Sequence, residues 1–175
     1  MFKFNPKLLR AAVYGANDGI VTTFAVVAGV AGAGLSHNII IVLGLANMFA
    51  DGLSMGLSDY LGEHSEQRMR KQLKGEYEED QLWHTGFVTF IAFIVAGFFP
   101  LIPYLTGFVG LTIPEENRFF LAICTTAFSL FLAGSLRTIM TGGAWIRNGL
   151  EMLSIGMLAA AASYTIGWLI DSYLL

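Results

Sequence analysis

Five long stretches of the sequence are almost free of charged side chains, and their length constrains the fold more than any other feature. They span residues 11–36, 38–61, 85–104, 118–140 and 149–173. A helix needs about 20 mostly apolar residues to cross the hydrocarbon core of a bilayer. Because 55% of the 175 residues are hydrophobic, the chain also has more apolar side chain than a soluble domain of this size can bury. We therefore predict an all-α integral membrane protein with five transmembrane helices in a single domain over residues 1–175.

The basic residues predict how the helices are oriented, because loops rich in Lys and Arg stay in the cytoplasm. All but Arg118 fall on one side of the predicted membrane, which places the N-terminus in the cytoplasm and the C-terminus on the opposite side. The first stretch is too long for a signal peptide and contains an aspartate, so we interpret it as a retained helix. The short N-terminus favours a prokaryotic plasma membrane. The basic residues on the cytoplasmic side are Lys3, Lys7, Arg10, Arg68, Arg70, Lys71, Lys74, Arg137 and Arg147.

Residues 62–84 form the one sizeable polar stretch, which we expect to be a short cytoplasmic segment. Residues 63–73 contain no helix breaker, so the second helix can continue into the cytoplasm. Gly75 then marks a break before an acidic cluster. A run of charges is usually a solvated surface, and metal binding by this segment is the alternative. The acidic cluster consists of Glu76, Glu78, Glu79 and Asp80.

The first stretch contains a carboxylate at membrane depth, Asp18, about two helical turns from its start. A charge there costs at least about 2.5 kcal/mol, so it needs a partner, a water-filled cavity or a proton. Gly15 and Gly19 form a GxxxG pair around it, and Thr22 follows one turn later on the same face. Small residues in this pattern let another helix approach closely, so we expect a helix-packing or dimer interface here.

The second stretch repeats this arrangement around Asp51, which is also followed by a glycine. At helical spacing one side of this helix carries an amide, a carboxylate, a hydroxyl and a thioether. Asp59, Glu63 and Glu66 follow toward the cytoplasmic end of this helix and are the candidates for metal entry. Gly52 and Gly56 form a second GxxxG pair, again predicting helix packing or a dimer interface. The four polar residues at membrane depth are Asn47, Asp51, Ser54 and Met55.

Two carboxylates and a thioether at membrane depth suit a divalent transition metal. Carboxylate oxygens favour cations such as Mn²⁺ and Fe²⁺, while a thioether discriminates against Mg²⁺ and Ca²⁺. Carboxylates that release protons when they bind metal also provide a route to proton coupling. We therefore predict a path for a divalent transition metal, Fe²⁺ or Mn²⁺, with proton coupling. Asp18, Asp51 and Met55 are the principal metal ligands in this hypothesis, and Asn47 and Ser54 contribute secondary oxygens.

Two other functions fit the same residues. A non-transporting membrane scaffold would use the GxxxG faces to bind a partner, and a passive cation channel would lack proton coupling. The formal net charge of −3 gives no basic surface for nucleic acid. The single cysteine, Cys124, excludes an internal disulfide, and no nucleophile and base pair indicates an enzyme. We expect no permanently bound cofactor, with the metal as substrate and H⁺ as coupling ion.

Three segments resemble the vacuolar iron transporter family, which includes nodulin-21-like proteins. They are GANDGIVTTFAVVAGVAGAG in the first stretch, ADGLSMGLSDYLGEHSE in the second and LEMLSIGMLAAAASYTIGWLI in the fifth. The resemblance implies a homodimer of five-helix subunits that moves Fe²⁺, and often Mn²⁺, out of the cytoplasm in exchange for protons. It also implies that Asp18 and Met55 line the translocation path near the dimer interface, where the glycines admit the helix of a second subunit.

The sequence departs from this family in two places. The position eight residues before Met55, often a glutamate in the family, is Asn47 here, and Asp51 follows one turn later. The carboxylate has either moved along the same face, or the site prefers a different metal. A long glutamate-rich cytoplasmic insertion between the second and third spans is reduced here to about twenty residues. We interpret the chain as a short form of the family in which Glu63 and Glu66 are the remnant of that insertion.

Overall fold

The computed structural model describes residues 5–74, 83–111 and 113–174. Within these ranges the chain forms five α-helices and one short 3-10 helix, and no strand. All five α-helices are long and apolar enough to cross a membrane. The predicted all-α fold with five transmembrane helices is therefore confirmed. The helices are α1 (Pro6–Gly32), α2 (His37–Lys74), α3 (Trp83–Leu105), α4 (Glu115–Thr141) and α5 (Trp145–Leu174), with the 3-10 helix η1 (Thr106–Val109) between α3 and α4.

The helices begin and end where local chemistry dictates. The side chain of Asn5 accepts a hydrogen bond from the backbone N–H of Lys7 at 3.0 Å and so caps α1, with proline at the first helical position. Gly34 has a φ of +61°, which a left-handed turn requires, and α1 therefore ends at Gly32 rather than at residue 36. Gly142 and Gly143 also have positive φ, and α5 begins directly after them at Trp145.

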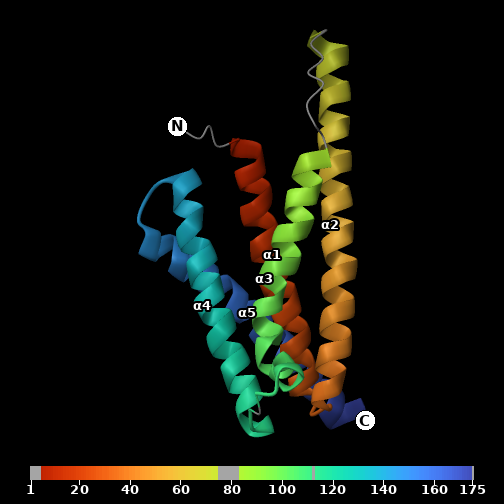
Figure 1. The fold of residues 1–175 in the computed structure, drawn as a ribbon, viewed down its shortest axis with the longest axis vertical. Coiled ribbons are helices and arrows are strands. Elements are labelled where there is room, and N and C mark those ends of the chain that lie inside the picture. The colour runs from red at the N-terminus through yellow and green to blue at the C-terminus, as the bar shows by residue number, and fades with distance from the viewer. Residues whose placement is uncertain (1–4, 75–82, 112, 175) are drawn as a thin grey trace.

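α2 is the longest helix, and it continues past the membrane-spanning stretch to Lys74. Figure 1 shows this extension projecting beyond the ends of the other helices. The expected continuation over residues 63–73 is thus confirmed, because no proline interrupts the hydrogen-bond ladder there. The acidic cluster from Glu76 to Asp80 lies outside the described residues, as does Lys3.

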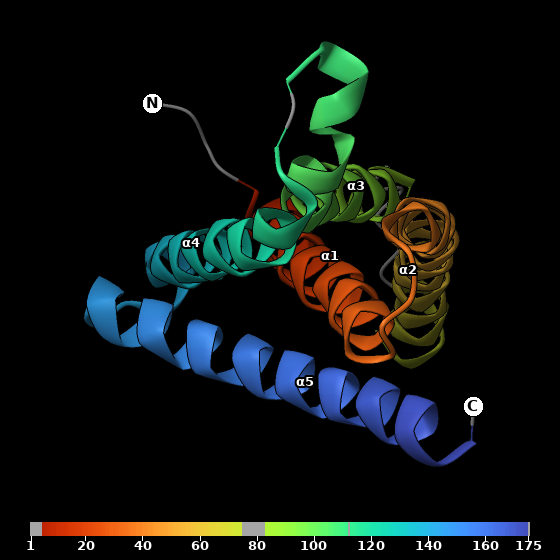
Figure 2. The ribbon, with the colours of Figure 1, turned by 90° about the horizontal axis from the view of Figure 1, so that it is seen from below.

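α1 is the central helix, and each of the other four packs against it. Figure 2 shows α2, α3, α4 and α5 arranged around α1, with α5 crossing it obliquely. Neighbouring pairs α2 and α3, α3 and α4, and α4 and α5 also pack together. Among the described residues α2 and α5 make at most marginal contact, so α1 is not fully enclosed between them.

The glycines of α1 are the positions at which its neighbours approach most closely. A Cβ atom at Gly15 would collide with the backbone carbonyl of Thr89, and one at Gly19 with that of Phe93. The backbone of α3 therefore lies directly against this GxxxG pair. Of the two predictions for these glycines, helix packing or a dimer interface, the structure shows helix packing, against α3 of the same chain.

The interior is filled by apolar side chains and the outer faces are apolar as well. Large side chains at Val42, Phe128 and Leu158 are more than half exposed on three different helices. Such an outer surface suits the hydrocarbon of a bilayer and not water. The largest fully buried side chains include Phe24, Ile40, Met48, Phe93, Leu101 and Leu130.

We use "the N-terminal end of the bundle" for the end at which α1, α3 and α5 begin and α2 and α4 end. α1 begins and α5 ends at opposite ends of the bundle, as five antiparallel helices in succession require (Figure 1).

Candidate functional site

The carboxylate of Asp18 lies half-buried on the side of α1 that is turned toward α2. Asp51 of α2 lies near enough to interact with it electrostatically, so acidic side chains from two different helices are neighbours here. Among the described residues none donates a hydrogen bond to the Asp18 carboxylate. Thr22, one turn later, donates its hydroxyl to the backbone carbonyl of Asp18 at 2.9 Å. The Thr22 hydroxyl thus donates within its own helix, a common arrangement for threonine in membrane helices.

Asp51 is held in place by its neighbour one turn earlier. The Nδ2 atom of Asn47 donates a hydrogen bond to Oδ2 of Asp51 at 2.8 Å, and both side chains are half-buried. The sequence analysis expected Asn47 to offer an amide oxygen to a metal. In the structure its amide N–H holds Oδ2 of the Asp51 carboxylate, so this hydrogen bond leaves Oδ1 of Asp51 unoccupied.

Met55 and Ser54 follow Asp51 on the same side of α2. Met55 is half-buried, and Ser54 is exposed. Gly52 and Gly56 point elsewhere: a Cβ atom at Gly52 would touch the side chains of Phe90 and Phe93, and one at Gly56 would lie 2.7 Å from the carbonyl oxygen of Gly86. Both glycines therefore pack α2 against α3 of the same chain.

The carboxylate pair is an open arrangement. Within the described part of the chain no three His, Cys, Asp or Glu side chains come close enough together to hold a metal. Asp18 and Asp51 supply two carboxylates, and Met55 adds a thioether. Such a set can bind a divalent cation only when water or another group fills the remaining coordination positions.

A cavity of about 460 Å³ opens at the N-terminal end of the bundle, and we call it the vestibule. It lies between the first turns of α1, the end of α2 and the start of α3. Asp59, Glu63 and Glu66, the three carboxylates that the sequence analysis assigned to metal entry, all line it. The other lining residues are Lys7, Arg10, Ala11, Tyr14, Ser58, Gly62, Arg70 and Thr85.

Each vestibule carboxylate has a partner in the structure. Glu63 forms an ion pair with Lys7 of α1. Glu66 pairs with Arg70 one turn later on α2. Asp59 accepts a hydrogen bond from the hydroxyl of Thr89 at 2.8 Å. A cation that enters the vestibule must therefore compete with Lys7 for Glu63 and with Arg70 for Glu66, whereas Asp59 is held by a neutral hydroxyl.

On each helix, a residue that lines the vestibule lies one turn from a residue of the predicted metal site. Tyr14 lines the vestibule and precedes Asp18 by four residues, which is about 6 Å along a helix. Asp59 lines it as well and follows Met55 by four residues. Tyr14 is 65% exposed, so its ring stands at the open face of α1 between the two sites.

Sequence reasoning missed the vestibule's basic side. Lys7 and Arg10 entered the sequence analysis only as orientation signals, and Tyr14 and Thr89 did not enter it as site residues. Lys7 and Glu63 are 56 positions apart, and only the packing of α1 against α2 brings them together. Helical periodicity relates residues within one helix, so it carries no signal for such a pair.

Comparison with known proteins identifies similar chains over most of this sequence. A model of the VIT family matches residues 9–80 and 68–168. Vacuolar iron transporter 1 of Arabidopsis thaliana is 26% identical over 216 residues, covering 90% of this chain and 84% of that protein. Vacuolar iron transporter homolog 1 of Oryza sativa subsp. japonica is 32% identical over 168 residues, covering 89% and 71%. Vacuolar iron transporter of Plasmodium falciparum is 22% identical over 221 residues, covering 91% and 81%.

The lengths of these alignments show that some of the relatives contain segments that this chain lacks. The Arabidopsis and Plasmodium alignments extend over more positions than this chain has residues, so those proteins contain segments that it lacks. The rice homolog aligns over 168 residues, close to the length of the chain that it covers. The two stretches matched by the family model meet at residues 68–80, in the polar segment after the second span. The chain is therefore a short form.

Proposed function

The chain belongs to the VIT family, and from this premise we propose that it exports Fe²⁺, and Mn²⁺ as a second substrate, from the cytoplasm in exchange for protons. Its relatives are named iron transporters, which supports transport of metal ions across a membrane. The proposal adds the direction, the second metal and the coupling to protons.

One observation carries the proposal: Asp18 of α1 and Asp51 of α2 lie near enough to interact electrostatically in the membrane-spanning stretches, and Met55 follows Asp51 by one helical turn. Two charges are expensive to bury in a membrane without a partner. A divalent cation between them supplies the opposite charge, and protons supply it when the cation has left. The same pair then binds metal and protons in alternation, which is what exchange requires.

The vestibule gives the site an entrance. With the N-terminal end of the bundle in the cytoplasm, as the basic residues predict, Asp59, Glu63 and Glu66 would receive the cation first. The cation would then pass Tyr14 to reach Asp18. Met55 would favour a transition metal over Mg²⁺ or Ca²⁺, since a thioether is a soft ligand.

A second copy of the chain would complete the site. The side of α1 that carries Tyr14 and Asp18 is open between α2 and α5, and the outer face of α5 is largely exposed. A homodimer that buries this side would shield the carboxylate pair from lipid and would supply further ligands. We place the dimer interface here, and not at the glycines that pack against α3.

Metal flux into proteoliposomes tests the proposal. Purified protein is reconstituted, and uptake of Fe²⁺ and of Mn²⁺ is measured with and without an imposed pH gradient. The account predicts uptake that the gradient accelerates and that the Asp18→Ala variant loses while its elution volume stays that of the wild type. Asp171→Ala, near the exposed end of α5, is the matched control and should transport normally.

Two outcomes would support the other functions. Uptake that ignores the pH gradient would indicate a passive channel. No metal uptake by correctly folded protein would instead favour a scaffold, in which the helix faces bind a partner protein. In that case Asp18→Ala would leave every measured property of the protein unchanged.

A further inference from the structure

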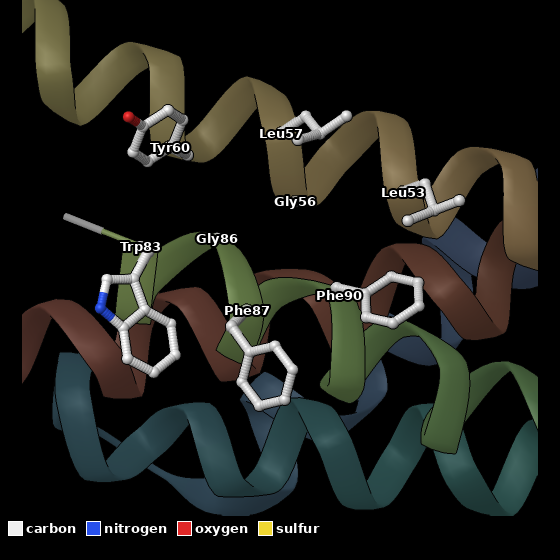
Figure 3. Close-up of a pocket in the computed structure, with 8 residues that line it drawn as sticks. All are labelled: Leu53, Gly56, Leu57, Tyr60, Trp83, Gly86, Phe87 and Phe90. Carbon is white, nitrogen blue, oxygen red and sulfur yellow. The ribbon is translucent and has the colours of Figure 1, made fainter.

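A groove runs along the outer surface between α2 and α3, on the side of α2 that is turned away from Asp51. We call it the α2–α3 groove, and it encloses about 340 Å³, within the range of small-ligand sites. Its surface is almost entirely apolar. Gly56 and Gly86 lie at its floor, where the backbones of the two helices approach each other (Figure 3). Its lining residues are Leu53, Gly56, Leu57, Tyr60, Trp83, Gly86, Phe87 and Phe90.

The two ends of the groove differ in polarity. Tyr60 and Trp83 lie across from each other at the end where α3 begins, and Leu53 and Phe90 lie at the other end (Figure 3). Tyr and Trp concentrate at membrane interfaces, where the ring contacts hydrocarbon and the O–H or N–H contacts headgroups. The groove therefore runs from the level of the headgroups into the hydrocarbon core.

The helical face above the groove is basic. His64 stacks on Tyr60 with ring centroids 6.1 Å apart, one turn further along α2. Arg68 follows after another turn and is exposed, and Lys71 continues the same face. Arg68 lies two turns beyond Tyr60, roughly 12 Å along the helix axis, so a phosphate between these two levels is within reach of its long side chain. The acidic residues Glu63 and Glu66 line the vestibule, on the other side of α2.

We propose that the α2–α3 groove binds an anionic phospholipid from the leaflet at the N-terminal end of the bundle. One acyl chain lies along Leu53, Leu57 and Phe87, and the phosphate lies beyond the Tyr60 and Trp83 rings, between the levels of Tyr60 and Arg68. Arg68 supplies the charge that the phosphate requires. The lipid fills the space between α2 and α3 and so supports the helix whose other side bears Asp51 and Met55. This site stands whether or not the chain transports metal.

Trp83 reports directly on the occupant of the groove. The chain has three tryptophans, so Trp145→Phe with Trp168→Phe leaves Trp83 as the single fluorophore. This variant is reconstituted into mixtures of phosphatidylglycerol and phosphatidylcholine, and either lipid carries brominated acyl chains, which quench tryptophan on contact. The relative association constant of the anionic lipid over the zwitterionic lipid is read from the two quenching curves.

The proposal predicts that Trp83 prefers the anionic lipid by about fivefold, the effect of one basic residue near anionic headgroups. Arg68→Gln should bring the ratio to about one, as should high salt. Arg147→Gln, on α5 at the same end of the bundle, is the matched control and should leave it unchanged. Leu57→Phe, which narrows the groove, should weaken quenching by both lipids, and the similarly exposed Leu136→Phe of α4 should not.

Three results would overturn the proposal. Equal quenching by the two lipids would show that only bulk bilayer contacts Trp83. A preference that survives Arg68→Gln would place the phosphate elsewhere. Weak quenching by both lipids in the parent variant would show that protein, such as a second copy of the chain, covers the groove.

Discussion

Lys7 contributes a positive charge to the vestibule, and removing this charge should lower the KM for metal uptake. Three basic and three acidic side chains line the cavity, so its formal net charge is zero. Lys7→Gln makes it −1 and releases Glu63 from its ion pair. The vestibule volume of about 460 Å³ places a central cation roughly 5 Å from the lining charges, where a divalent ion and a unit charge interact by roughly 1.7 kcal/mol in water.

Salt screens this interaction, but the energy that remains still changes the KM measurably. Screening at 0.1 M leaves about 1 kcal/mol, so the KM for metal uptake should fall about fivefold in Lys7→Gln. Glu63→Gln makes the vestibule +1 and should raise the KM by about the same factor. The double variant restores neutrality and should return close to the wild-type KM. Arg147→Gln, outside the vestibule, is the control for a change of total charge.

Initial rates of Mn²⁺ uptake into proteoliposomes at 20 mM and at 500 mM salt provide the assay. The differences between variants should shrink at high salt, because the Debye length falls well below the width of the cavity. The reasoning would be refuted if Lys7→Gln raised the KM, or if the double variant behaved like either single one. Either result would mean that the Lys7–Glu63 pair acts by holding α1 to α2 and not by its charge.

Three further substitutions test individual contacts. Met55→Leu keeps the volume and removes the thioether, so the ratio of Fe²⁺ to Mn²⁺ uptake should fall severalfold in a competition assay. Asn47→Ala removes the hydrogen bond that orients Asp51 and should lower the uptake rate about threefold to tenfold, whereas Asn47→Asp would test a carboxylate at that position. Gly19→Leu inserts a side chain where the backbone of α3 lies and should destabilise the protein by about 3 kcal/mol or more in thermal unfolding, whereas Gly62→Ala, with open space around it, should be silent.

The sequence predicts the helices because the residues that form each helix are contiguous, so their hydropathy and the absence of helix breakers can be read directly. The apolar lengths give five spans, and the absence of a breaker between Glu63 and Leu73 gives the extension of α2. The ends are less predictable: residues 33–36 looked apolar enough to be helical, and the φ of Gly34 ends the helix before them. Hydropathy measures composition, and it does not measure backbone conformation.

The sequence of one helix does not say which other helix packs against it. A GxxxG pair predicts that some helix approaches Gly15 and Gly19, but any helix with a smooth face satisfies the pattern. The structure selects α3 of the same chain. The same limit applies to the vestibule. Asp59, Glu63 and Glu66 lie on one helix, so the sequence of that helix groups them. Lys7 lies on another helix, and only the tertiary fold shows that it lines the same cavity.

The central claim is that Asp18 and Asp51 form one metal site that exchanges protons for metal. Mn²⁺ binding to the purified protein, followed by the electron paramagnetic resonance of the free ion with simultaneous measurement of released protons, tests it most directly. The account predicts proton release on binding, a loss of at least about tenfold in affinity for Asp18→Asn and for Asp51→Asn, and no further loss in the double variant. Wild-type affinity in either single variant, or additive losses in the double variant, would contradict it.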